Sequence, residues 1–68
     1  QVELLYSIEF DYTQMNDVMM ILKQFNCNVL AQEMQLFCLI KTGIPKNRLD
    51  EVLYRLNDLQ NVSVKKTG

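Results

Sequence analysis

Histidine and tryptophan are absent from this sequence of 68 residues, and glycine and proline are rare, with two copies and one copy. Without histidine, the chain lacks the commonest general base and the commonest metal ligand of proteins. Nucleophilic pairs of serine or cysteine with histidine are therefore excluded within the chain. Glycine occurs only at Gly43 and Gly68, so no glycine-rich phosphate-binding loop is present. These absences predict a domain that is not an enzyme and that holds no cofactor.

Cysteine is also scarce, since Cys27 and Cys38 are the only two. Two cysteines are too few for a disulfide scaffold, and their separation does not match the Cys-x-x-Cys spacing of redox and metal sites. We therefore expect two reduced, buried thiols in a cytoplasmic protein. Long apolar runs are missing as well, because none approaches the roughly 18 residues that a membrane span requires. The sequence accordingly predicts no membrane partner.

Charge of one sign is not in excess, because seven basic and eight acidic residues leave a net charge of −1. A domain that binds phosphate backbones usually carries a strongly basic surface. The near balance therefore argues against nucleic acid as the main partner. Because the sequence begins without an initiator methionine, we also expect it to be one part of a longer, two-domain protein.

What the chain does have is apolar residues, which make up 49% of it and suffice for one core shared by all elements. Alternation of apolar and polar residues over 2–10 predicts a first strand with one buried face. A capping box at Asp11 and Gln14 then predicts the start of a helix, whose end is expected near Asn26 and Asn28. The apolar stripe of this helix consists of Met15, Val18, Met19, Leu22 and Phe25.

The remaining residues predict three more elements of regular structure. The β-branched and apolar residues over 27–44 favour two strands joined by a turn between Glu33 and Leu36. Pro45 suits the first position of a second helix, and residues 61–65 predict a fourth strand. The apolar stripe of the second helix consists of Leu49, Val52, Leu53, Leu56 and Leu59.

This order of elements predicts one α+β domain over residues 1–68. The arrangement is a ferredoxin-like β-α-β-β-α-β two-layer sandwich, in which two helices cover one face of an antiparallel four-stranded sheet. The other face of the sheet stays open. Which face the second strand buries is not determined by its sequence.

The open sheet face is expected to carry an apolar patch. If Cys38 and Ile40 point into the core, alternation turns Phe37 and Leu39 outward, on the same face as Leu5 of the first strand. Exposed apolar groups of this kind usually mark a contact surface. Leu5, Phe37 and Leu39 are therefore the predicted docking residues, and the alternative is a partly shielded patch without a function.

Basic residues offer a second candidate surface. Lys41 on the open face, with Lys65 and Lys66 near the C-terminal end, are the predicted contacts if the domain binds nucleic acid. Stacking of RNA bases on this sheet is less favoured, because Glu3 and Glu9 place acidic groups on the same face. The alternative interpretation of the two C-terminal lysines is a solvated tail.

Three carboxylates form the remaining candidate cluster. Glu9 and Asp11 share a strand face, and Glu33 is expected on a neighbouring strand. Such a trio suits a hard cation, but carboxylates are more often simply solvated, and Asp11 already has a capping role. The sequence therefore predicts no metal site.

Short motifs along the whole chain carry a family resemblance. They are the Asp11-Tyr12 pair after the first strand, Asn28-Val29-Leu30, Ile44-Pro45 and the stripe of Leu49, Val52 and Leu53. With these motifs the sequence resembles the C-terminal domain of the YigZ/IMPACT-like family. It departs from the family at Met34-Gln35-Leu36, where members carry a polar or glycine-containing turn, and at Gln60-Asn61, where a glycine is common.

This resemblance implies a fold similar to the C-terminal domain of translation elongation factor G. It also implies an N-terminal IMPACT-type domain elsewhere in the protein, and a link to translation or RNA handling. It supplies no catalytic residue for this part of the protein.

Three functions are compatible with these observations. The leading hypothesis is a non-catalytic accessory domain of a cytoplasmic IMPACT-like protein, which docks through its open sheet face onto the N-terminal domain or onto another protein. The second is a nucleic-acid- or ribosome-binding module linked to translation. The third is an ACT-type small-molecule regulatory domain. That type shares the topology but usually has a glycine-containing loop after the first strand, where this chain has Asp11-Tyr12-Thr13.

Overall fold

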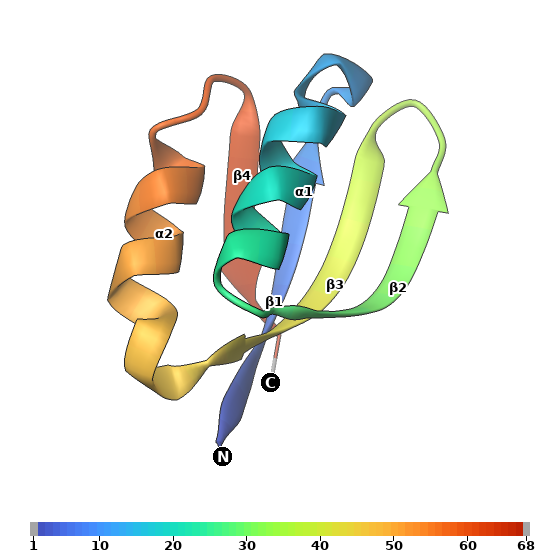
Figure 1. Ribbon diagram of the computed structural model, residues 1–68. Coiled ribbons are helices and arrows are strands. Elements are labelled where there is room, and N and C mark those ends of the chain that lie inside the picture. Colours follow the sequence, from blue (N-terminus) through green and yellow to red (C-terminus); the bar gives the residue numbers. More distant parts are fainter. Residues whose placement is uncertain (1, 68) are drawn as a thin grey trace.

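Four strands form one antiparallel sheet in the order β2-β3-β1-β4, and two helices lie on one of its faces (Figure 1). The computed structural model describes residues 2–67, so Gln1 and Gly68 of the predicted domain lie outside the described residues. The elements are β1 (Glu3–Phe10), α1 (Met15–Gln24), β2 (Asn28–Met34), β3 (Cys38–Pro45), α2 (Leu49–Asn57) and β4 (Val62–Lys66). This order confirms the predicted α+β ferredoxin-like fold, β-α-β-β-α-β.

β1 is a central strand, with β3 on one side and β4 on the other. Its alternating pattern places Ile8 and Phe10 in the core and leaves Glu9 exposed between them. Ile8 lies opposite Ile40 of β3 and opposite Val64 of β4. The helix-facing side of the sheet is therefore apolar across three strands, as the alternation predicts.

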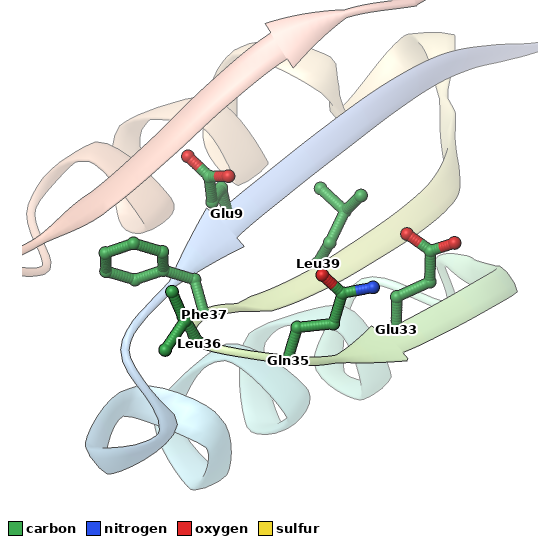
Figure 2. Close-up of a pocket in the computed structure, with 6 residues that line it drawn as sticks. All are labelled: Glu9, Glu33, Gln35, Leu36, Phe37 and Leu39. Carbon is green, nitrogen blue, oxygen red and sulfur yellow. The ribbon is translucent and has the colours of Figure 1, made fainter.

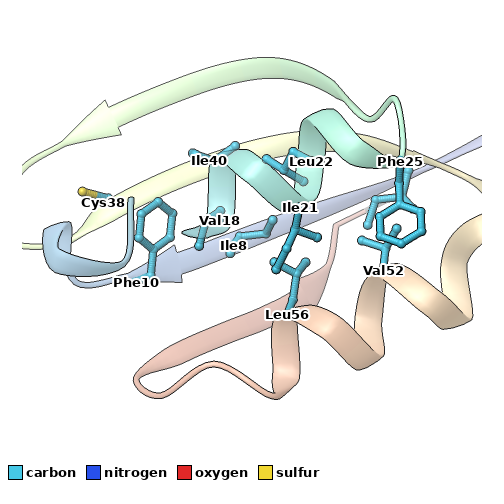
Figure 3. Packing of buried hydrophobic residues seen from close by; sticks show 11 residues of the cluster. Ile8, Phe10, Val18, Ile21, Leu22, Phe25, Cys38, Ile40, Val52 and Leu56 are labelled. Carbon is cyan, nitrogen blue, oxygen red and sulfur yellow. The ribbon is translucent and has the colours of Figure 1, made fainter. Parts of the chain in front are cut away.

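The core lies between this side of the sheet and the two helices (Figure 3). Both predicted apolar stripes contribute to it, α1 through Val18 and Leu22 and α2 through Val52 and Leu56. Ile21, which the predicted stripe omits, is also buried and belongs to the same cluster. Ile21 lies three residues after Val18, so it falls on the same apolar side of α1.

Helix α1 begins through a short 3-10 turn, Tyr12–Gln14, rather than directly at the predicted capping box. The Asp11 carboxylate accepts a hydrogen bond from the Thr13 amide at 3.3 Å, so Asp11 caps this turn. At the other end, Asn26 adopts a positive φ of 56° and stops the helix, as predicted. The Cys27 amide then donates to the Leu22 carbonyl at 2.8 Å.

The turn between β2 and β3 lies later than predicted. Glu33 and Met34 still belong to β2, and Met34 lies opposite Cys38. Residues 35–37 therefore form the turn, in which the Gln35 amide donates to the Phe37 carbonyl at 3.1 Å. The sequence did not mark this position, because no glycine or proline lies near it.

β2 is an edge strand, and all of its 7 residues are exposed. Its register against β3 shifts between Val29 and Ala31, which leaves Leu30 as the extra residue of a bulge. After the bulge, Ala31 and Glu33 face the open side of the sheet, opposite Lys41 and Leu39. The register therefore defines which side chains of β2 point to each face of the sheet, which the sequence alone left undetermined.

Pro45 was predicted as the first residue of the second helix, and this is wrong. Pro45 is the last residue of β3. It lies opposite Glu3 with an extended backbone, ψ 130°, and a 3-10 turn, Lys46–Arg48, separates it from α2. Proline is tolerated there because β2 pairs with β3 only as far as Gly43, so no strand on that side needs an N–H donor from residue 45. The helix itself begins at Leu49.

The first and last described residues, Val2 and Thr67, lie at the same end of the sheet. Figure 1 shows β1 beginning and β4 ending there. There the Lys46 amide donates to the Val2 carbonyl and the Thr67 amide donates to the Leu5 carbonyl, both at 2.9 Å. The β2–β3 turn lies at the opposite end, beside Phe10. Within residues 2–67, no helix is long and apolar enough to cross a membrane.

Candidate docking site on the open sheet face

The open sheet face consists of rows of side chains that run across the strands. The row nearest the β2–β3 turn reads, from β2 to β4, Glu33, Leu39, Glu9 and Ser63. The next row reads Ala31, Lys41, Ser7 and Lys65. An acidic row with one leucine therefore lies beside a row with two lysines.

The predicted docking patch of Leu5, Phe37 and Leu39 is split in the structure. Leu39 lies opposite Glu9, whereas Leu5 lies opposite Gly43, which is four residues further along β3. That separation is about 13 Å, and the Ser7 row lies between the two leucines. Leu5 is therefore on the predicted face but away from the other two residues.

Leu39 and Phe37 instead line a shallow hollow beside the β2–β3 turn (Figure 2). The hollow has a volume of about 220 Å³ and is lined by Glu9, Glu33, Gln35, Leu36, Phe37 and Leu39. Leu36 is 96% exposed and Phe37 is 58% exposed. Apolar side chains held out at the tip of a hairpin in this way are typical of a contact surface.

The sequence analysis missed Leu36 and the two glutamates as parts of this site. The available signal was the turn itself, because Leu36-Phe37 is an apolar pair where turns usually carry small or polar residues. The role of Glu9 and Glu33 depends on the register of three strands, and no local pattern of the sequence reveals it.

Glu9 is the centre of a larger concave area. A second hollow of about 190 Å³ is lined by Ser7, Glu9, Leu39, Ser63 and Lys65. A third, of about 320 Å³, is lined by Glu9, Phe10, Phe37, Asn61, Val62 and Ser63. The ion pair found within residues 2–67 joins Arg48 to Glu51, so the exposed Glu9 and Glu33 carboxylates form no direct ion pair with a described residue.

The predicted basic contacts do not form one cluster. Lys41 and Lys65 lie on the open face on either side of Ser7, about 10 Å apart, since one strand separates them. Lys66 lies opposite Tyr6, whose side chain packs on the core, and therefore points to the helix side of β4. Glu9 is a diagonal neighbour of both open-face lysines.

Both cysteines are free thiols at opposite ends of β2. Cys27 precedes Asn28, which lies opposite Gly43, whereas Cys38 lies opposite Met34. Burial, and second the Glu3 carboxylate, raise the pKa of the Cys27 thiol from 9.0 to about 11. Cys27 is therefore protonated at neutral pH, which makes it a poor nucleophile and a poor metal ligand.

The carboxylates considered as a cation site are dispersed. Glu9 and Glu33 lie on either side of Leu39, and Asp11 caps the 3-10 turn beyond β1. Among residues 2–67, no group of three or more Asp, Glu or Cys side chains is placed to hold a metal ion. The concave area therefore combines exposed apolar groups with separate charges.

Comparison with known proteins supports the fold. No family model matches the sequence, and no curated protein matches it. A solved structure titled "Crystal structure of an hypothetical protein" superposes with a TM-score of 0.89 at 17% sequence identity. The match covers 100% of this chain and 34% of that chain, so this chain spans about a third of the length of the protein it resembles.

Proposed function

We propose that the chain is a non-catalytic docking domain of an IMPACT-like cytoplasmic protein. It binds a protein segment at the turn end of its open sheet face, and the segment belongs to the N-terminal domain of the same protein or to another protein. The observation that carries this proposal is the exposed apolar pair Leu36 and Phe37 beside Leu39, in a hollow flanked by Glu9 and Glu33.

The side chains that line the hollow indicate which kind of protein segment would bind there. Burying one leucine side chain that is otherwise in water is worth about 1.5–3 kcal/mol, so covering Leu36 favours association. Glu9 and Glu33 favour a partner with a lysine or arginine on either side of its apolar contact. A protein segment with apolar residues flanked by basic ones matches this surface.

The wider assignment has three supports. The solved structure with the same fold is a chain about three times as long, so this fold also occurs within larger proteins. The motifs at Asp11-Tyr12 and Ile44-Pro45 resemble those of the YigZ/IMPACT-like family. The two free thiols suit the reducing conditions of the cytoplasm.

Site-specific cross-linking tests the docking proposal. A photoreactive amino acid is introduced at Phe37 in the natural protein, with the same substitution at the exposed Tyr54 of α2 as the control. We expect protein cross-links, within the chain or to another protein, from position 37 and not from position 54. Leu39→Glu in the same protein is expected to abolish the cross-link, and an unchanged cross-link would contradict the proposal.

A nucleic-acid- or ribosome-binding module is the second candidate, and the exposed pair Lys41 and Lys65 favours it. Glu9 opposes it, because a carboxylate beside both lysines repels phosphate. Amide chemical shifts of the labelled domain, titrated with a short structured RNA at low and high salt, distinguish the two. Salt-sensitive shifts at Lys41, Ser7 and Lys65 would favour the second candidate over protein docking.

The ACT-type regulatory function receives less support from the structure. Such a function needs an open loop after β1 to admit a small molecule. Here the chain turns at once into the 3-10 turn Tyr12–Gln14, which Asp11 caps. An amino-acid screen by thermal shift tests it, and a rise in melting temperature would favour it.

A further inference from the structure

The two edges of the sheet differ in how they are protected. β4 ends in Lys65 and Lys66, and its Val62 and Val64 pack against the core. β2 contains no lysine and no proline, and its sole charge is Glu33. Charged residues, proline and bulges are the usual means by which an edge strand avoids pairing with another strand. β2 has only the charge of Glu33 and the bulge at Leu30.

The helix-facing side of β2 is largely exposed. In Figure 1 the helices lie over the other strands, and β2 extends beyond them. Met34 lies on this side together with Gln32, because side chains alternate from Ala31 onward, and Leu30 is the bulge residue that precedes them. Leu30 and Met34 are 58% and 52% exposed. Alternate residues of an edge strand also direct their amide and carbonyl groups away from the sheet. β2 therefore offers both unpaired backbone groups and apolar side chains.

We propose that β2 pairs with β2 of a second copy of this chain, antiparallel about a two-fold axis at Gln32. The pairing joins two four-stranded sheets into one sheet of eight strands. It uses the edge of the sheet, and it leaves the hollow around Glu9 and Phe37 free for its own partner.

The sequence of β2 is self-complementary in this register. Leu30 of one copy lies opposite Met34 of the other, and the reverse pair completes the contact, so the two exposed apolar side chains cover each other. Glu33 lies opposite Ala31, so the one charge of the strand does not meet its own copy. The bulge at Leu30 ends the pairing there.

Gln32 lies opposite its own copy at the axis. A glutamine side chain carries both a donor and an acceptor, so two of them can bond to each other across the axis. The Gln32 side chain reaches α1, and its amide nitrogen is 4.0 Å from the sulfur of Met19. The exposed Met20 follows on the same helix, beside a hollow lined by Asn16, Met19, Met20 and Lys23. Because methionine side chains are flexible, Met19 and Met20 can repack against the second copy.

A second copy suits this edge better than a charged partner. In a two-fold dimer the same surface patch of each copy contacts the other, so the unpaired backbone groups of both β2 edges find partners. The net charge of −1 leaves little long-range repulsion between two copies. Because the paired segment is short, the association belongs to the weak class of interfaces and depends on protein concentration.

Sedimentation equilibrium of the chain between about 10 µM and 1 mM tests the proposal. We expect reversible dimers of the wild-type chain. The double variants Leu30→Lys with Met34→Lys and Leu30→Glu with Met34→Glu place like charges opposite each other, so each is expected to dimerise at least tenfold more weakly. An equimolar mixture of the two pairs lysine with glutamate and is expected to restore the dimer. Tyr54→Lys, on the exposed side of α2, is the control and dimerises like the wild type.

Several results would overturn the proposal. A wild-type chain that stays monomeric at 1 mM contradicts it, as does a dimer that survives both double variants. Restoration that fails in the mixture contradicts the register centred on Gln32. If circular dichroism finds the variants unfolded, hydrogen exchange of the wild-type chain decides instead. Amides of residues 30–34 must then gain protection as the protein concentration rises, and equal protection contradicts the pairing.

Discussion

The hydroxyl of Thr42 donates a hydrogen bond of 2.6 Å to the carbonyl oxygen of Asn28. Thr42 is fully buried on β3, and Asn28 is the first residue of β2. The bond therefore fastens the start of the edge strand to the core of the sheet. It also satisfies the one buried polar residue, and within residues 2–67 no buried side-chain nitrogen or oxygen lacks a partner.

Removing this hydroxyl should loosen the start of β2. Thr42→Val keeps a branched side chain but leaves the Asn28 carbonyl without its donor, so the free energy of unfolding should fall by about 1–2 kcal/mol. Urea unfolding measures the change. Thr67→Val, at an exposed threonine, is the control and should change stability by less than about 0.5 kcal/mol. Equal stability of the Thr42 variant and the wild type would contradict this role.

Ile21 should behave as a core residue despite its absence from the predicted stripe. It is buried between the helices and the sheet, so Ile21→Val should cost about 1 kcal/mol through the lost methylene and the space it leaves. Met20→Ala, on the exposed side of the same helix, should cost less than about 0.5 kcal/mol. Urea unfolding of both variants tests the contrast, and equal losses would speak against it.

Asn26 and Asn61 should tolerate glycine better than alanine. Their φ angles of 56° and 59° lie in the left-handed region, where a residue with a Cβ is strained and asparagine is among the few that adapt. Alanine at either position should lower the free energy of unfolding by about 1 kcal/mol, whereas glycine should stay within about 0.5 kcal/mol of the wild type. Chemical denaturation of the four variants would refute this if alanine matched glycine.

Stability should depend on pH through Cys27. Its pKa is about 11 in the folded chain against 9.0 ordinarily, so the folded state favours the protonated thiol. The stabilisation is fully present below pH 9 and is lost as the pH rises from about 9 to 11. Unfolding of the wild type and of Cys27→Ser at pH 8 and pH 10.5 measures it. The advantage of the wild type should shrink at the higher pH, and a constant difference would disagree with this assignment.

Glu3 should account for part of the raised pKa of Cys27. Its carboxylate is the second cause after burial, and it also accepts a hydrogen bond of 2.7 Å from the Asn28 side chain. Glu3→Gln removes the charge, so the pKa of Cys27 should fall part of the way toward 9.0. The pH dependence of alkylation by iodoacetamide reports the change. An unaltered profile would assign the whole shift to burial.

Elements with a strong local period were predictable from the sequence. The alternation in β1 and the stripes of α1 and α2 predict both the type of each element and most of the core. Ile21 also fits the helical period, three residues after Val18, so its burial was predictable although the predicted stripe left it out. Pro45 was misplaced because proline suits a strand end as well as a helix start.

The candidate site was predictable only in part, because it depends on the register of the strands. Alternation places Leu5 and Leu39 on one face, but the register separates them by four residues along β3. Lys66 falls on the other face from Lys65, which alternation within the predicted fourth strand already implied. The bulge at Leu30 decides which face β2 presents, and a bulge has no sequence signal of its own here.

The position of the chain ends limits how a tethered partner reaches the domain. Both ends leave the sheet beside Leu5 and Val2, whereas the Glu9 hollow lies at the other end of β1. The 8 residues of β1 span about 27 Å. A covalently attached domain would therefore reach the hollow in one of two ways. It would have to be large enough to span this distance itself, or be joined by a connection of roughly eight extended residues. For the proposed docking, a shorter tether and a small neighbour would leave the hollow to a separate molecule.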